Sequence, residues 1–151
     1  MEDFLSLYQV NVLSAFQLSR AAAPFLKKVK GCIVNVSSIS ALNGVGSSIA
    51  YTCSKGAMVT LTLSLAHALS PEVRVNCICP GFIQGRWTKN FLGDRYEEVN
   101  SKFAGASTLQ QTTTPEDIAD AVAYFVTRAK LSTGEIRTID GGFSHHVVSL
   151  G

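Results

Sequence analysis

The chain has 151 residues, which is enough for one domain with a core of its own and too few for two ordinary domains. Hydrophobic residues make up 46% of it and charged residues 16%, a balance that excludes a disordered chain. The formal net charge of +2 gives no reason to expect a nucleic-acid partner. Lys27, Lys28 and Lys30 form the tightest basic cluster, which suits the last turn of a helix with Gly31 at the C′ position.

The cysteines and histidines suggest neither a metal site nor a redox motif. The cysteine spacing fits neither a zinc site nor a CxxC pair, so we expect small buried apolar residues in a reduced, cytoplasmic protein; they are Cys32, Cys53, Cys77 and Cys79. His67, His145 and His146 lack the Cys or carboxylate neighbours of a metal site, and no metal is expected. No apolar run reaches the length of a membrane span, and the first residues, Met1-Glu2-Asp3, do not resemble a secretory signal.

The first elements predicted along the chain are a helix, a strand and a loop. Apolar residues recur on nearly every face over 4–28, which predicts a long helix covered on more than one side. The β-branched run over 32–36 follows Gly31 and predicts a central parallel strand. Residues 37–48 are rich in Ser, Gly and Asn and are expected to form a loop.

The order of helix followed by strand then repeats along the chain. A helix is predicted over 49–69, a strand over 73–79, and short helices around 87–92 and 96–103. Thr114 as N-cap, followed by Pro and two acidic residues, predicts a helix that reaches Thr127, and a last strand covers 135–139. This alternation predicts an α/β fold with a parallel sheet, and residues 1–151 are expected to form a single domain.

Three polar residues suggest an active site. Ser38 follows the first predicted strand, and ligands of α/β sheets bind at the carboxyl ends of strands. Tyr51 lies thirteen residues later near the start of a helix, with Lys55 one helical turn further on. An ammonium beside a phenol favours the phenolate, which makes Tyr51 a candidate proton donor to a carbonyl. A Tyr-x-x-x-Lys pair alone is a weak signal, because most such pairs lie on a solvated helix face.

The wider context makes the signal specific. The stretches VNVSSIS (34–40), AYTCSKGAM (50–58), RVNCICPGF (74–82), TPEDIADAVAYF (114–125) and TIDGGFS (138–144) follow in order, after Asn11 in YQVNVLSAF. Over nearly its whole length the chain resembles the classical short-chain dehydrogenases/reductases. The resemblance implies the C-terminal half of a Rossmann-like, doubly wound parallel sheet, with three strands and flanking helices.

The resemblance also implies roles for individual residues. Tyr51 would be the general acid-base and would also contact the cofactor. Lys55 would lower the pKa of Tyr51 and hold the nicotinamide ribose. Ser38 would polarise the substrate carbonyl, and Asn11 would anchor, through its helix backbone, a water that relays protons to Lys55. The nicotinamide would be contacted by residues at the end of the second strand, which are Pro80, Gly81 and Ile83.

Alternatives remain open at this point. Ser37 could replace Ser38, although the thirteen-residue spacing to Tyr51 favours Ser38. Asn11 could only satisfy hydrogen bonds in a buried helix, and Asn76 is expected to be structural. The family commonly has Thr two residues after the residue corresponding to Ile83, whereas this chain continues with Gln84-Gly85. The glycine-rich turn that binds the cofactor pyrophosphate is missing from the sequence, and with it the residues that would select NAD or NADP.

The resemblance implies an NAD- or NADP-dependent oxidoreductase that interconverts a ketone and a secondary alcohol, nearest to 3-oxoacyl-thioester reductases and related dehydrogenases. Its partners would be a small carbonyl or alcohol substrate and further copies of the chain. A homodimer or homotetramer is expected, formed by helices over 3–28 and 49–69 in a four-helix interface. Neither a nucleic acid nor a membrane is expected as a binding partner. The alternative is a truncated, non-catalytic fragment or pseudoenzyme that retains only oligomerisation or ligand binding.

Overall fold

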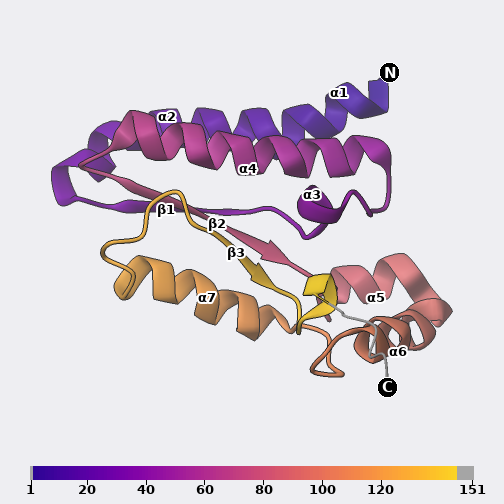
Figure 1. Ribbon diagram of the computed structural model, residues 1–151. Coiled ribbons are helices and arrows are strands. Elements are labelled where there is room, and N and C mark those ends of the chain that lie inside the picture. Colours follow the sequence, from indigo (N-terminus) through magenta and orange to yellow (C-terminus); the bar gives the residue numbers. More distant parts are fainter. Residues whose placement is uncertain (1, 146–151) are drawn as a thin grey trace.

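The computed structural model describes residues 2–145, and a three-stranded parallel sheet lies at its centre (Figure 1). The strands are β1 (Cys32–Val36), β2 (Arg74–Pro80) and β3 (Ile136–Ile139), in the order β1-β2-β3. Val34 pairs with Asn76 across the first ladder, and Ile78 pairs with Arg137 across the second. The sheet confirms the predicted α/β fold with three parallel strands and flanking helices.

Helices cover both faces of this sheet. In Figure 1, α2 (Ser14–Val29) and α4 (Ile49–Leu69) lie on one face and α7 (Pro115–Thr127) lies on the other. The short helices gather mainly beyond the carboxyl ends of the strands; they are α3 (Ser40–Asn43), α5 (Arg86–Leu92), η2 (Gly93–Arg95), α6 (Tyr96–Ala106) and η3 (Phe143–His145). This arrangement leaves the carboxyl edge of the sheet as the place where several elements meet.

Strand β2 carries the core on both of its faces because successive side chains of a strand point in opposite directions. Val75 is fully buried and packs with Leu65 of α4, whereas Ile78 is fully buried and packs with Phe125 of α7. The odd-numbered positions therefore face α4. Cys77 and Cys79, both fully buried, lie on that side of the sheet.

The first helical segment differs from the single helix predicted over 4–28. It consists of α1 (Glu2–Tyr8), a π-helical turn η1 (Gln9–Leu13) and α2. At the end of this turn the backbone N–H of Ser14 donates to the carbonyl of Gln9, five residues earlier, instead of the usual four. Periodicity cannot reveal such a turn because the apolar pattern continues through it.

The end of α2 also differs in detail from the prediction. Lys27 and Lys28 occupy the last turn as expected, but Lys30, with φ of 50°, adopts the left-handed conformation assigned to Gly31. Gly31 lies close to the helix that precedes it: a Cβ there would lie 2.7 Å from Cδ2 of Leu26, whose side chain would have to shift. The glycine therefore allows the chain to pass closely over its own helix on its way into β1.

The other boundaries lie close to their predicted positions. Helix α4 has the predicted bounds, β2 begins and ends one residue later than predicted, and the expected loop over 37–48 contains the short helix α3. Thr114 caps α7 as predicted and forms a capping box with Asp117, because each residue's side chain accepts a hydrogen bond from the other's backbone N–H.

The prediction of four buried cysteines is half wrong. Cys77 and Cys79 are buried, but Cys53 is exposed and Cys32 is only partly buried. Cys53 is on the solvent side of α4, and Cys32 begins a strand at the edge of the sheet, so neither position is enclosed. His67 is exposed. The side chain of His145 and all of His146 lie outside the described part of the chain.

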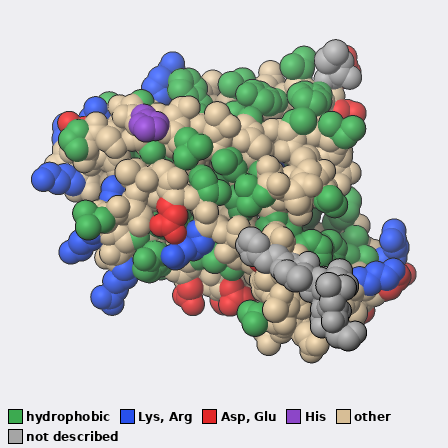
Figure 2. Space-filling model, viewed as in Figure 1, with side chains coloured by type: hydrophobic (Ala, Val, Ile, Leu, Met, Phe, Trp, Pro, Cys, Tyr) green, Lys and Arg blue, Asp and Glu red, His purple; other side chains and the backbone are tan. Residues whose placement is uncertain are grey.

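Within residues 2–145, the outer edge of β1 pairs with no other strand. A groove of about 360 Å³ lies between α2 and this edge; it is lined by Ala15, Leu18, Ser19, Ala22, Leu26, Cys32, Ile33 and Asn35. Figure 2 shows apolar side chains on the upper surface, where α1, α2 and α4 lie in Figure 1. No helix among these residues combines the length and the apolar character that a membrane span requires.

Candidate active site

The candidate residues are placed by the end of β1 and the beginning of α4. Ser48 is the N-cap of α4, and its hydroxyl accepts a 3.1 Å hydrogen bond from the backbone N–H of Tyr51. This cap starts the helix three residues before Tyr51, so Tyr51 lies in the first turn and Lys55 one turn later. Ser38 is the second residue after β1, which places it at the carboxyl edge of the sheet.

Tyr51 and Lys55 lie side by side, as the helical spacing predicts. The Lys55 Nζ is 5.7 Å from the centroid of the Tyr51 ring and donates a 3.1 Å hydrogen bond to the carbonyl of Val36, the last residue of β1. Burial lowers the pKa of the Lys55 ammonium, and the Cys77 and Cys79 thiols oppose this shift. The cation is therefore held at the end of β1 in partly desolvated surroundings.

Ser37 and Ser38 have different surroundings. Ser37 is 4% exposed, and its hydroxyl donates a 2.7 Å hydrogen bond to the backbone carbonyl of Lys55. Ser38 is half-buried, and its hydroxyl oxygen accepts a 3.2 Å hydrogen bond from the backbone N–H of Ser40. Because that bond uses the oxygen of Ser38 as acceptor, its proton remains available for another group. The geometry thus gives Ser37 a structural partner and leaves Ser38 a proton to donate.

Asn11 reaches the same helix from the π-helical turn. Its Nδ2 donates a 2.8 Å hydrogen bond to Oγ of Ser54, and that hydroxyl donates a 2.7 Å bond to the carbonyl of Tyr51. Asn76 is structural, as expected: its side chain donates to the carbonyl of Ser132 and accepts from the backbone N–H of Glu135. These contacts join the loop before β3 to the middle of β2.

Pro80 and Gly81 lie where all three strands end. The carbonyl of Pro80 accepts a 3.0 Å hydrogen bond from the N–H of Ile39, and the N–H of Gly81 donates a 2.8 Å bond to Ile139. A Cβ on Gly81 would lie 2.8 Å from Cβ of Asp140, so no larger residue fits there without a shift. The two residues therefore fasten the loop after β1 and the end of β3 to β2.

Ile83 belongs to a neighbouring segment. It forms an isolated parallel bridge with Thr113, and its carbonyl accepts a 2.8 Å hydrogen bond from the hydroxyl of Thr88. The family commonly has Thr two residues after this Ile, and that position is occupied here by Gly85, the N-cap of α5. The side chain of Gln84, the residue before it, donates a 2.8 Å hydrogen bond to the hydroxyl of Thr112. The structure places Ile83 beside the 112–113 segment and records no hydrogen bond between it and Tyr51 or Lys55.

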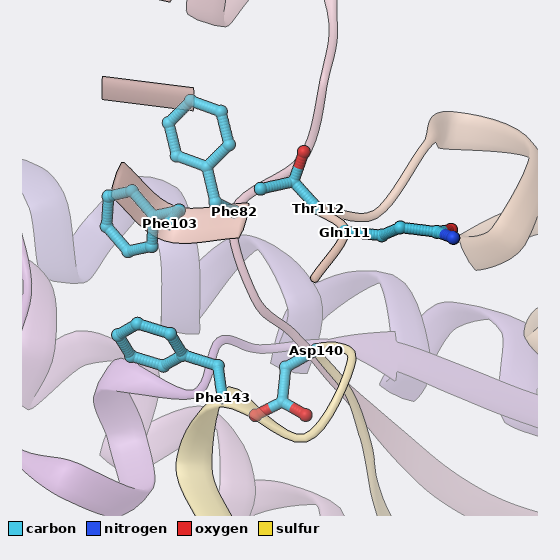
Figure 3. Close-up of a pocket in the computed structure, with 6 residues that line it drawn as sticks. All are labelled: Phe82, Phe103, Gln111, Thr112, Asp140 and Phe143. Carbon is cyan, nitrogen blue, oxygen red and sulfur yellow. The ribbon is translucent and has the colours of Figure 1, made fainter. Parts of the chain in front are cut away.

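Three phenylalanine rings form an aromatic cluster beside the segments that follow β2 and β3. Phe103 stacks on Phe82 with ring centroids 4.8 Å apart and lies 5.3 Å from Phe143. Figure 3 shows these rings on one side of a small pocket with polar residues on the other. Among the polar residues, Asp140 accepts hydrogen bonds from the backbone N–H groups of Gly142 and Ser144, so its carboxylate holds the turn after β3.

Comparison with known proteins decides the family. A family model described as Enoyl-(Acyl carrier protein) reductase matches residues 1–144. The "Short-chain dehydrogenase/reductase homolog YusR" of Bacillus subtilis is 44% identical over 128 residues, which is 84% of this chain and 95% of that protein. The chain belongs to the short-chain dehydrogenase/reductase family.

Other relatives are longer. The cyclopentanol dehydrogenase of Comamonas sp. is 35% identical over 146 residues, which cover 95% of this chain and 58% of that enzyme. The solved structure of ElxO with NADP bound has a TM-score of 0.79 and 28% identity, and the match covers 90% of this chain and 56% of that one. The chain therefore spans over half the length of these two relatives and nearly all of the YusR homologue.

The residues present fit one end of the family's nicotinamide cofactor. Lys55 has three N–H donors, and one of them is bonded to Val36, so two remain for hydroxyl acceptors such as those of a ribose. The closely packed Pro80-Gly81 turn offers backbone rather than bulky side chains at the same edge. The glycine-rich turn that holds a pyrophosphate in this family has no counterpart in the sequence. The fit is thus to the nicotinamide ribose end.

The sequence prediction missed Ser54 and the pair Cys77 and Cys79. Ser54 could have been recognised, because a hydroxyl three residues after Tyr51 faces nearly the same side of the helix. The cysteines lie under Lys55 on the same face of β2. Hydrogen bonding from Cys77 lowers the pKa of the Cys79 thiol, and Ser37, the Ser38 backbone and the charge of Lys55 act in the same direction against burial. Only the pairing of strand and helix reveals this contact.

Proposed function

We propose that residues 1–151 form the catalytic part of an NAD- or NADP-dependent oxidoreductase that interconverts a ketone and a secondary alcohol. The observation that carries the proposal is the placement of Lys55, 5.7 Å from the Tyr51 ring and bonded to Val36 at the end of β1, two residues before Ser38. A proton donor, a cation and a second hydroxyl therefore meet at the carboxyl edge of a parallel sheet, where α/β proteins bind ligands.

Each of the three side chains has a task in this reaction. Ser38 donates its free proton to the substrate oxygen and holds the carbonyl in place. Tyr51 delivers a proton to that oxygen as the carbonyl is reduced, and takes it back in the reverse direction. The positive charge of Lys55 stabilises the phenolate that Tyr51 becomes when it gives up its proton. The bound nicotinamide supplies or accepts the hydride.

The comparisons support this class of substrate and cofactor. The Comamonas relative is named for a secondary alcohol, cyclopentanol, and ElxO was solved with NADP. We therefore propose a small carbonyl or alcohol substrate and a nicotinamide dinucleotide as the partners of this chain. Among relatives of the family, a 3-oxoacyl thioester is the substrate class that we would test first.

Titration of the purified chain with NADH and NADPH, followed by fluorescence, tests cofactor binding, and circular dichroism shows whether the chain is folded. A carbonyl-reduction screen with the bound cofactor then tests turnover. Tyr51→Phe should abolish turnover and preserve binding, whereas Tyr124→Phe, on the exposed side of α7, should leave both unchanged. Full turnover in Tyr51→Phe would contradict the mechanism.

One observation favours a second function, association without catalysis. The outer edge of β1 has no partner strand within residues 2–145, and an unpaired apolar edge promotes strand pairing with another chain. A folded chain that binds neither nucleotide but forms stable assemblies would support this alternative. Saturable nucleotide binding would favour the oxidoreductase.

A further inference from the structure

Ser54 lies between the two candidate residues of α4 and is completely buried. Its hydroxyl has two partners from different parts of the chain. It donates a 2.7 Å hydrogen bond to the carbonyl of Tyr51, and it accepts a 2.8 Å bond from Nδ2 of Asn11 in the π-helical turn. The residue thus joins the backbone of the candidate proton donor to a helix 43 residues away in sequence.

The direction of these bonds fixes the orientation of the Asn11 amide. A serine hydroxyl has a single proton, and in Ser54 that proton is given to the carbonyl of Tyr51. Toward Asn11, Ser54 can therefore only accept, so Asn11 must turn its NH₂ group toward Ser54 and its oxygen away. Without the hydroxyl, nothing in this contact would distinguish the two orientations of the amide.

We propose that Ser54 is a positioning residue of the active site, which ties the π-helical turn η1 to the first turns of α4 and thereby fixes both the Asn11 amide and the Tyr51 backbone. The proposal rests on the proposed function. A buried hydrogen-bonded link of this kind holds a side chain to a narrow set of positions, and a displacement of about 1 Å can cost a factor of roughly 100 in rate. Ser54 touches neither substrate nor cofactor in this role.

The same helix contains a matched control. Thr62, also completely buried, accepts a 2.9 Å hydrogen bond from Nδ2 of Asn35 and donates a 2.9 Å bond to the carbonyl of Met58. An asparagine, a hydroxyl and a helix carbonyl are thus linked twice along α4. The second link involves none of the candidate catalytic residues, so its loss should affect stability without affecting the active site.

The first test needs no activity. Hydrogen exchange of the backbone amides in Gln9–Leu13 would be compared in the wild-type chain, Ser54→Ala and Thr62→Ala. We expect Ser54→Ala to raise exchange in this turn about ten-fold, in line with the loss of one buried hydrogen bond, and Ser54→Thr to restore protection. Thr62→Ala should lower the melting temperature to a similar degree but leave exchange in Gln9–Leu13 as in the wild-type chain. Equal exchange in Ser54→Ala and Thr62→Ala would overturn the proposal.

The second test measures turnover and separates this proposal from the proposed function. In Ser54→Ala we expect kcat to fall at least ten-fold, the KM for the nucleotide to change little, and the midpoint of the pH profile of kcat to move. In Thr62→Ala, the KM and the pH midpoint should match the wild-type values. If the wild-type chain turns over and Ser54→Ala keeps its kcat and pH midpoint, the positioning role is wrong. If no form turns over, the proposed function fails, and the exchange experiment alone decides whether Ser54 holds the turn.

Discussion

The hydroxyl of Ser37 donates a 2.7 Å hydrogen bond to the backbone carbonyl of Lys55. The side-chain ammonium of Lys55 in turn donates a hydrogen bond to the carbonyl of Val36, the residue before Ser37. The end of β1 therefore holds Lys55 by both its backbone and its side chain. This double attachment places the cation relative to the sheet and separates the task of Ser37 from that of Ser38.

Substitution of the two serines should give opposite results. Ser37→Ala removes a buried hydrogen bond, and we expect it to lower the free energy of unfolding by about 1–2 kcal/mol. Ser38→Ala should leave stability nearly unchanged, because its hydroxyl only accepts one bond from a loop N–H, but should lower carbonyl reduction by at least about 100-fold. Urea denaturation and a reduction assay measure both effects. Loss of activity in Ser37→Ala with full activity in Ser38→Ala would reverse the assignment.

The buried ammonium of Lys55 should make stability depend on pH. Burial lowers the pKa of Lys55 below its ordinary value of 10.5, so between the lowered value and 10.5 the unfolded chain holds a proton that the folded protein has released. Because the unfolded state binds more protons in this window, this group makes the free energy of unfolding rise with pH. Below the lowered pKa the charged, buried form is a constant penalty.

Lys55→Met tests this dependence, since methionine keeps much of the side-chain volume without the charge. We expect the variant to be at least as stable as the wild-type chain at neutral pH, although the bond to Val36 is lost. The stability of the wild-type chain relative to Lys55→Met should then increase as the pH rises toward 10.5. Denaturant titrations at a series of pH values measure the difference. A constant difference would show that burial does not perturb Lys55.

The glycine after β2 should tolerate no side chain. A Cβ on Gly81 would lie 2.8 Å from Cβ of Asp140, the residue that holds the turn after β3, whereas a Cβ on Gly85 would meet nothing within 4 Å. We expect Gly81→Ala to lower the free energy of unfolding by about 1–3 kcal/mol through overpacking. Gly85→Ala should change it by less than about 0.5 kcal/mol. Thermal melts of both variants measure this contrast, and equal melting temperatures would contradict it.

The alternation of elements and the spacing of motifs were enough to predict the three strands, α4 and the pair of Tyr51 and Lys55. These three features depend on local regularities of the sequence: β-branched runs for the strands, a capped start for the helix, and the spacing of one helical turn for the pair. The cap of α7 by Thr114 was predicted for the same reason. At these positions the local preference of the chain and its tertiary packing agree.

The features that the sequence could not reveal depend on contacts between distant segments. The π-helical turn around Asn11 leaves the apolar pattern intact, and the partner of that residue, Ser54, belongs to another helix. The left-handed residue at the end of α2 is Lys30 and not Gly31, whose close approach to Leu26 depends on how the chain leaves the helix. Exposure of Cys53 likewise follows from which side of α4 meets the sheet.

The outer faces of the first helices and α4 should associate in solution. Large apolar side chains are exposed there, among them Val10 at 66% and Leu63 at 41%, and exposed apolar surface of this extent on monomers is unusual. Light scattering should therefore find a dimer or a larger assembly, as the family resemblance implies. A monodisperse monomer would contradict this expectation.

A pair of variants locates the interface. Leu63→Glu places a charge on the outer face of α4 and should shift the assembly toward monomers, since a buried unpaired carboxylate costs several kcal/mol. Leu131 is fully exposed in the segment after α7, so Leu131→Glu should leave the mass unchanged. If neither substitution alters the mass, the outer edge of β1, which is unpaired within the described residues, becomes the surface that joins the copies. In that case the helices do not form the interface that the family resemblance implies.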